Sequence, residues 1–125
     1  MTPSKTDLLD SLQRLQQERR TLLRRLTRPG KLAIGSVSTV RRKCGNPSCH
    51  CAREGGHLQT LFLFQDQRVG RRRCKLVRRA DESWMMEAGE RYRSFRKGLQ
   101  RLRAIDSEEK RILMAIAEER AVHYE

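Results

Sequence analysis

The sequence predicts an α+β protein in which a small antiparallel β unit lies between two long helices that form a coiled-coil-like hairpin. Residues near both ends repeat apolar side chains at helical spacing, whereas residues 31–80 mix β-branched residues, glycines and short alternating runs. The hydrophobic fraction of 37% and aromatic fraction of 5% are small for a chain of 125 residues, so one compact core is disfavoured. We therefore divide the chain into residues 1–29, 31–80 and 81–125, as one structural unit.

Residues 1–29 are predicted to form the first helix. Ser4 and Asp7 resemble a capping box at its start, and Pro29-Gly30 stops it. Apolar side chains recur at alternating spacings of four and three residues, with one basic interruption, which is a heptad pattern: Leu8, Leu12, Leu15, Arg19, Leu22 and Leu26.

The middle segment is predicted to contain three strands, which are Ser36–Lys43, Leu58–Gln65 and Arg71–Arg79. Residues 66–70 suit a hairpin turn between the last two. Because side chains alternate along a strand, the third strand presents a row of cations on one face. The members of that face are Arg71, Arg73, Lys75, Val77 and Arg79.

The last segment, residues 81–125, is predicted to be the longest helix, with Asp81 or Ser83 as N-cap. Asp106-Ser107 suggests a break within it. Its apolar repeat favours pairing with the first helix or with a second chain, and we expect a homo-oligomer formed through the helices. The repeat consists of Met85, Ala88, Tyr92, Phe95, Leu99 and Leu102.

Three cysteines fall within eight residues, as Cys44, Cys49 and Cys51, with the turn residues Gly45, Asn46 and Pro47 between them. Zinc prefers four nitrogen or sulfur ligands in tetrahedral geometry, and structural sites often combine three cysteines with one histidine. A redox switch is disfavoured because no Cys-x-x-Cys pair is present. The sequence therefore predicts a structural Zn²⁺ ion that staples the β unit.

The fourth ligand has three candidates, which are His57, Cys74 and His50. We favour His57 because Gly55-Gly56 allows the chain to fold back onto the site. His50 lies between two ligands, so its ring is expected to point away from the metal. Cys74 shares a strand face with Leu76, which suits a small buried apolar residue better.

The formal net charge is +13, and it is concentrated in one part of the chain. Residues 11–80 hold 18 Lys and Arg against 3 acidic residues, a net of +15. Such a localised basic patch predicts a nucleic-acid partner. Arginine dominates over lysine, which suits phosphate binding, and few aromatics are available for stacking, which favours duplex DNA. The expected contacts are Arg24, Arg25, Arg28, Arg41, Arg42, Lys43, Arg53, Arg71, Arg72, Arg73, Lys75, Arg78 and Arg79.

Residues 35–52 resemble the signature of a bacterial, archaeal and phage family of unknown function. The resemblance is carried by Arg41, Arg42 and the run Cys44-Gly-Asn-Pro-Ser-Cys49-His50-Cys51. Members of that family carry an arginine-rich strand, a C-G-x-P-x-C-x-C knuckle, a His-Gly-Pro-Tyr-like element, a β-hairpin and a long helix. The resemblance covers residues 35–102 and implies that His57 is a zinc ligand, although Leu58-Gln59-Thr60 replaces the Gly-Pro-Tyr. Such members often occur on mobile elements, which implies a link to transposition or recombination and a recombinase or transposase as partner.

Enzymatic function is disfavoured, because no Ser-His-Asp set, carboxylate pair or phosphate-binding glycine loop is apparent and a closed zinc site leaves no open position. Residues 1–10 are polar and the apolar runs are short, so a cytoplasmic location without a membrane partner is expected. The leading hypothesis is a non-enzymatic, zinc-containing nucleic-acid-binding accessory protein. The alternatives are a coiled-coil adaptor that recruits a recombinase or polymerase, and an RNA-binding component of a ribonucleoprotein.

Overall fold

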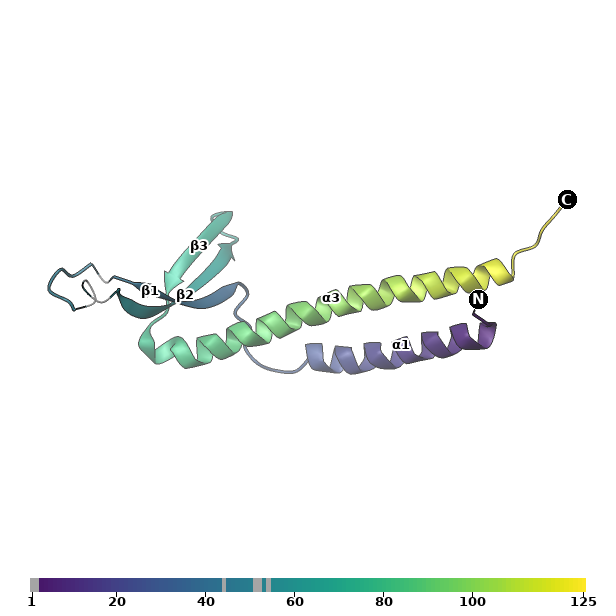
Figure 1. Cartoon of the computed structure of the whole chain (residues 1–125), viewed down its shortest axis with the longest axis horizontal. Helices are drawn as coiled ribbons and strands as arrows, with labels where there is room; N and C mark the ends of the chain where they lie inside the picture. Colours follow the sequence, from purple (N-terminus) through teal and green to yellow (C-terminus); the bar gives the residue numbers. More distant parts are fainter. Residues whose placement is uncertain (1–2, 44, 51–52, 54) are drawn as a thin grey trace. The chain divides into compact units, whose positions relative to one another are not determined.

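The computed structural model describes residues 3–43, 45–50, 53 and 55–125 (Figure 1). They form an α+β chain with a three-stranded antiparallel sheet between two helices, as predicted. The chain divides into a helical unit, Met1–Pro29 with Phe95–Glu125, and a sheet unit, Gly30–Ser94. The elements are α1 (Lys5–Leu26), β1 (Ser36–Arg42), β2 (His57–Asp66), β3 (Arg71–Leu76), the short 3₁₀ helix η1 (Arg79–Asp81) and α3 (Glu82–Glu119).

Helix α1 begins with the capping box expected from the sequence. The Asp7 N–H donates to Ser4 Oγ at 3.2 Å, and the Ser4 N–H donates to Asp7 Oδ2 at 3.3 Å, so two N–H groups without helical partners are satisfied. At the other end, the Thr27 hydroxyl donates to the Leu23 carbonyl at 2.8 Å. Both ends of the helix are therefore defined by hydrogen bonds between residues close together in the sequence.

The core of the helical unit is small and lies between α1 and the part of α3 that begins at Phe95. The two helices run antiparallel, because Leu26 lies against Gly98 whereas Arg19 reaches Glu109. A Cβ at position 98 would lie 2.5 Å from Leu26 Cδ2, so glycine permits the close approach of the helices there. The buried cluster consists of Leu15, Leu22 and Ile105, with Leu26, Leu102 and Ile112 packed against it, and Leu8 of α1 is also buried.

Helix α3 starts at Glu82, so Asp81, one of the two expected N-cap residues, directly precedes it, whereas Ser83 lies inside its first turn. The expected break at Asp106-Ser107 is wrong, because the helix continues through both residues. Asp106 does not end the helix because its carboxylate accepts from Arg19 of α1 and not from its own backbone. Arg19, in turn, is an ion-pair position of the heptad seam and not an interruption of it.

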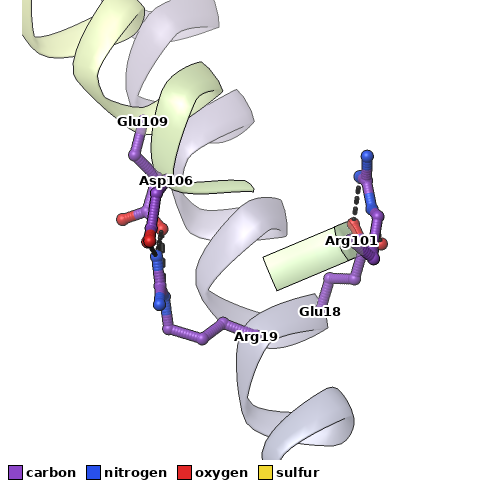
Figure 2. A network of polar contacts seen from close by, with 5 residues as sticks. All are labelled: Glu18, Arg19, Arg101, Asp106 and Glu109. Carbon is purple, nitrogen blue, oxygen red and sulfur yellow. Dashed lines mark hydrogen bonds and ion pairs between the residues drawn. The ribbon is translucent and has the colours of Figure 1, made fainter. Parts of the chain in front are cut away.

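Two sets of ion pairs join the helices of the helical unit on opposite sides of the seam (Figure 2). On one side, Arg19 binds Asp106 and Glu109, with Arg19 Nε at 3.0 Å from Glu109 Oε1. On the other, Arg101 makes a bidentate pair with Glu18, at 2.6 and 2.8 Å. The hydrogen bond from Arg101 holds the pKa of the Glu18 carboxyl below its usual value, and the bonds to Asp106 and Glu109 raise the pKa of Arg19.

The sheet has the order β1-β2-β3, with both neighbouring pairs antiparallel. The first two strands match the predicted ones to within a residue at each end. The predicted extension of the third strand to Arg79 is wrong, because β3 ends at Leu76. The Val77 N–H makes a last bond to the Thr60 carbonyl at 2.8 Å, and the chain then turns into η1, where the Asp81 N–H donates to the Arg78 carbonyl at 2.9 Å.

Within the sheet unit, α3 approaches the sheet at Gly89. A Cβ at Gly89 would lie 3.0 Å from the side chain of Val37 on β1, so the glycine brings helix and strand close. The preceding segment is tied to the helix by the Ala33 N–H, which donates to the Ala88 carbonyl at 3.1 Å. Thr60 of β2 is the buried polar residue of the described chain.

Neither α1 nor α3, within the described residues, contains a stretch that is both long enough and apolar enough to cross a bilayer.

The Glu18–Arg101 pair predicts a pH dependence of stability. The folded-state pKa of Glu18 is lowered from 4.5, so the pair stabilises the fold above the unfolded pKa, and this contribution is lost as pH falls through the lower, folded pKa. Glu18→Gln should therefore flatten the fall in the free energy of unfolding between about pH 5 and pH 3. Urea unfolding at each pH measures the free energy of unfolding, and Glu119→Gln at the end of α3 is the control. An equal effect of both substitutions would contradict the assignment.

Candidate functional site

The loop between β1 and β2 is closed at its base by backbone pairing. Arg42 pairs with His57 at the end of the ladder, so residues 43–56 leave and re-enter the sheet at one point. Gly56 lies at this point with φ of +104°, and a Cβ there would come within 2.6 Å of the Arg42 carbonyl carbon. The Arg41 guanidinium donates to the Gly56 carbonyl at 3.4 Å. Only glycine fits this position without strain, for reasons of both space and backbone angle.

A tight turn inside the loop positions Cys49. The side-chain oxygen of Asn46 accepts from the Ser48 N–H at 3.1 Å and from the Ser48 hydroxyl at 2.7 Å, which is an Asx turn. The Cys49 N–H donates to the Asn46 carbonyl at 3.0 Å and completes it. The turn residues between the cysteines therefore build the local backbone, as their identities predicted.

Two of the four predicted zinc ligands lie together. Cys49 Sγ is 3.1 Å from His57 Nε2, whereas sulfur and nitrogen ligands of one tetrahedral zinc would be about 3.5 Å apart. His50 packs edge-on against His57, with ring centroids 5.5 Å apart. The other two predicted ligands, Cys44 and Cys51, lie outside the described residues. Among the residues that the structure does describe, no group of three or more metal-ligating side chains is found.

Cys74, an alternative fourth ligand, lies far along the sheet from His57. It pairs with Leu63, six residues further along β2 than His57. At about 3.4 Å per residue this separates the two positions by about 20 Å. Cys74 is exposed on β3 and is not the buried apolar residue that the sequence suggested.

The cations of β3 are exposed along its whole length. Arg71, Arg73 and Lys75 alternate with Arg72, as the period of a strand requires. Arg73 Nη1 is 2.9 Å from Asp66 Oδ2, so the Asp66 carboxylate neutralises the charge of Arg73 in part. The Lys75 ammonium lies 5.9 Å from the centre of the Phe64 ring. Within the described part of the chain, no acidic side chain pairs with Arg71, Arg72 or Lys75.

Asp66 has a larger role than the sequence suggested. Besides binding Arg73, it accepts from the Arg68 N–H at 2.9 Å and so shapes the β2–β3 turn. These bonds, that of Arg73 first, hold the pKa of the Asp66 carboxyl below its usual value. Arg68 itself is exposed in this turn, and it is a further cation beside β3 that the predicted contacts omitted. Its position in the predicted hairpin turn, next to the arginine run, could have identified it from the sequence.

The remaining predicted contacts divide between the two units. In the sheet unit, Arg78 binds Asp81 at 3.1 Å, and the pKa of that carboxyl is lowered first by a hydrogen bond from Trp84 and then by Arg78. The exposed members in the sheet unit are Arg41, Arg42, Lys43, Arg53, Arg78 and Arg79, and those at the end of α1 in the helical unit are Arg24, Arg25 and Arg28.

Together these elements define an α+β protein with a closed β1–β2 loop and an arginine-rich edge strand. Residues 12–87 match the model of a family described as "Domain of unknown function (DUF6788)", and the chain belongs to this family. The match begins inside α1, further toward the N-terminus than residues 35–102 on which the resemblance to a family of unknown function rests. Comparison with curated proteins and with solved structures gave no match.

The closure of the loop predicts different costs for two neighbouring glycines. A Cβ at Gly55 meets no atom of the described residues within 4 Å, so Gly55→Ala is strained only by its φ of +92°, whereas Gly56→Ala also collides with the Arg42 backbone. We expect Gly56→Ala to lower the free energy of unfolding by about 1–3 kcal/mol more than Gly55→Ala does. Chemical denaturation of both variants measures the difference. Equal destabilisation would show that the backbone contact at position 56 is unimportant.

Proposed function

We propose that this protein is a non-enzymatic nucleic-acid-binding protein that binds duplex DNA through β3 and the β2–β3 turn. The observation that carries the proposal is the exposure of Arg71, Arg72, Arg73 and Lys75 on one strand. Three of these four have no acidic partner among the described residues. Exposed, uncompensated arginines on a strongly basic chain are the usual electrostatic footprint of phosphate binding.

The register of the sheet adds a geometric argument. β1 pairs with β2 only as far as Leu63, so Phe64–Asp66 of β2 pair with β3 alone. The end of the hairpin that carries Arg68 and Arg71–Arg73 is therefore a two-stranded ribbon. A two-stranded β-ribbon fits the major groove of DNA. Alternate residues of a strand are about 6.8 Å apart, which equals the rise of two base pairs.

We also propose that Cys44, Cys49, Cys51 and His57 bind one structural zinc ion. The proposal is supported by the 3.1 Å separation of Cys49 Sγ from His57 Nε2 and by the donor set, three thiolates and one imidazole. The ion would hold residues 43–56, where few apolar side chains are available to order a loop. A closed set of four ligands would leave no position for a substrate, consistent with a non-enzymatic role.

The partner in a larger assembly is proposed from the resemblance alone. Members of the resembling family often occur on mobile elements, so we propose a recombinase or transposase as the protein that this chain assists. RNA binding, and an adaptor role without any nucleic acid, are outcomes of the experiment below.

The nucleic-acid proposal predicts a strong effect of charge reversal on β3. Arg71→Glu/Arg72→Glu should weaken binding to a duplex DNA by about tenfold or more. It should also reduce the slope of log affinity against log salt by about 2, because two phosphate contacts are lost. Fluorescence anisotropy with a labelled duplex, at several salt concentrations, measures both quantities.

Arg103→Glu/Arg111→Glu on α3 is the matched control, because it makes the same change of net charge at two exposed arginines of the helical unit. If both double variants lose affinity equally, net charge and not β3 governs binding. Tighter binding to double-stranded RNA than to DNA would favour the ribonucleoprotein alternative. Absence of binding to any nucleic acid at low salt would leave the adaptor and refute the proposal.

The zinc proposal predicts one zinc ion per chain in native mass spectrometry. Cys49→Ser and His57→Gln should each lower occupancy strongly, because the ligand set is broken, whereas Cys74→Ser should retain the metal. His50→Gln, also expected to retain it, separates the two neighbouring histidines. Zinc-free wild-type protein, or loss of zinc in the Cys74 variant alone, would disprove the ligand assignment. The result is independent of DNA binding, so the two proposals fail separately.

A further inference from the structure

The two flanks of the helical hairpin differ in character. One flank carries the Glu18–Arg101 ion pair (Figure 2). The opposite flank, which holds Asp106 and its partner Arg19, has apolar side chains on both helices. These are Leu9, Leu23, Leu99 and Leu113, exposed to 47%, 43%, 37% and 52%, and together they are called the leucine flank.

The placement of the four leucines follows from their spacing. Leu99 and Leu113 each lie seven residues from Asp106, and Leu9 and Leu23 each lie seven residues from Gln16. Seven residues are close to two helical turns, so each set lies along one line of its helix. Because α1 and α3 are antiparallel in this unit, the lines are neighbours on the same side of the seam. Leu99, expected in the seam, instead belongs to this exposed line, since Gly98 and Leu102 occupy the seam.

The leucine flank is self-complementary. Leucines lie at both ends, and the polar residues Gln16, Arg19 and Asp106 lie between them. A two-fold axis parallel to the helices places α1 of one chain against α3 of the other, and so brings leucine against leucine at both ends. The same axis places Arg19 of one chain opposite Asp106 of the other, so that opposite charges meet. Isologous dimers need this kind of pattern, and a polar layer between apolar ones specifies register.

The size of the flank is sufficient for a stable dimer. α1 has 22 residues, and is therefore about 33 Å long. Two adjacent helices, each about 10 Å wide, present about 650 Å² per chain, or about 1,300 Å² for two chains. Stable interfaces bury about 1,200–2,000 Å². The four buried residues of the hairpin, Leu8, Leu15, Leu22 and Ile105, are few for two long helices, and a second hairpin would bury more.

We propose that the leucine flank binds a second copy of this chain, so that two hairpins form a four-helix bundle. This surface is distinct from β3 and from the β1–β2 loop, and the proposal does not rest on nucleic-acid or zinc binding.

The test is the oligomeric state of the full-length chain without nucleic acid, measured by sedimentation equilibrium from about 1 to about 100 μM. The wild type should be a dimer. Leu113→Lys should raise the dimer dissociation constant by about 30-fold or more, because it places a charge in an apolar contact. Met114→Lys is the matched control, since Met114 is the adjacent residue, is 62% exposed and lies off the leucine flank.

Circular dichroism confirms that each variant keeps its helix content, and Leu23→Lys on α1 repeats the test from the other helix. A monomeric wild type over the whole range would overturn the proposal. Equal effects of Leu113→Lys and Met114→Lys would overturn it as well, because the contact would then not be specific to the flank. A dimer that persists in both Leu113→Lys and Leu23→Lys would place the interface elsewhere and have the same consequence.

Discussion

Strand β2 is the element on which the sheet unit depends, because it pairs with β1 along one edge and with β3 along the other. Its first residue, His57, pairs with Arg42 and closes the β1–β2 loop. Its last three residues extend past β1 and pair with β3 alone. The proposed zinc site and the proposed DNA-binding ribbon are thus positioned by the two ends of the same strand. A shift of register would turn every side chain of β2 to the other face and move both sites.

The charge of the chain is compensated unevenly. In the helical unit, Asp106 and Glu109 of α3 bind Arg19 of α1, and Glu18 of α1 binds Arg101 of α3. Such exposed pairs contribute little to stability, but they reduce the field of the unit and favour one alignment of the helices. In the sheet unit, Asp66 and Asp81 bind Arg73 and Arg78, while the other β3 cations have no acidic partner in the described part of the chain. The β3 cations differ from the exposed Arg24, Arg25 and Arg28 at the end of α1 by lying on a two-stranded ribbon, which makes β3 the better candidate for phosphate contacts.

Both units bury few apolar side chains. The described residues contain six buried hydrophobic residues, of which two are alanines. Small or thin cores are commonly supplemented by a metal ion or by oligomerisation. Zinc in the β1–β2 loop would stabilise the sheet unit in this way, and a second copy on the leucine flank would stabilise the helical unit. Both proposals therefore compensate for a small apolar core, one by metal binding and the other by burial of leucines.

The sequence by itself determined the local structure: the capping box at Ser4, the helical repeat of α1, the extents of β1 and β2 and the turn at Asp66. Each depends on residues close together in the chain. The nearness of His57 to Cys49 was also expected, from Gly55-Gly56, although zinc binding stays a prediction. Tertiary structure alone decided the partners of Arg19 and Asp106, the end of β3 and the distance of Cys74 from the loop. These follow from helix alignment and strand register, which depend on contacts between residues far apart in the sequence.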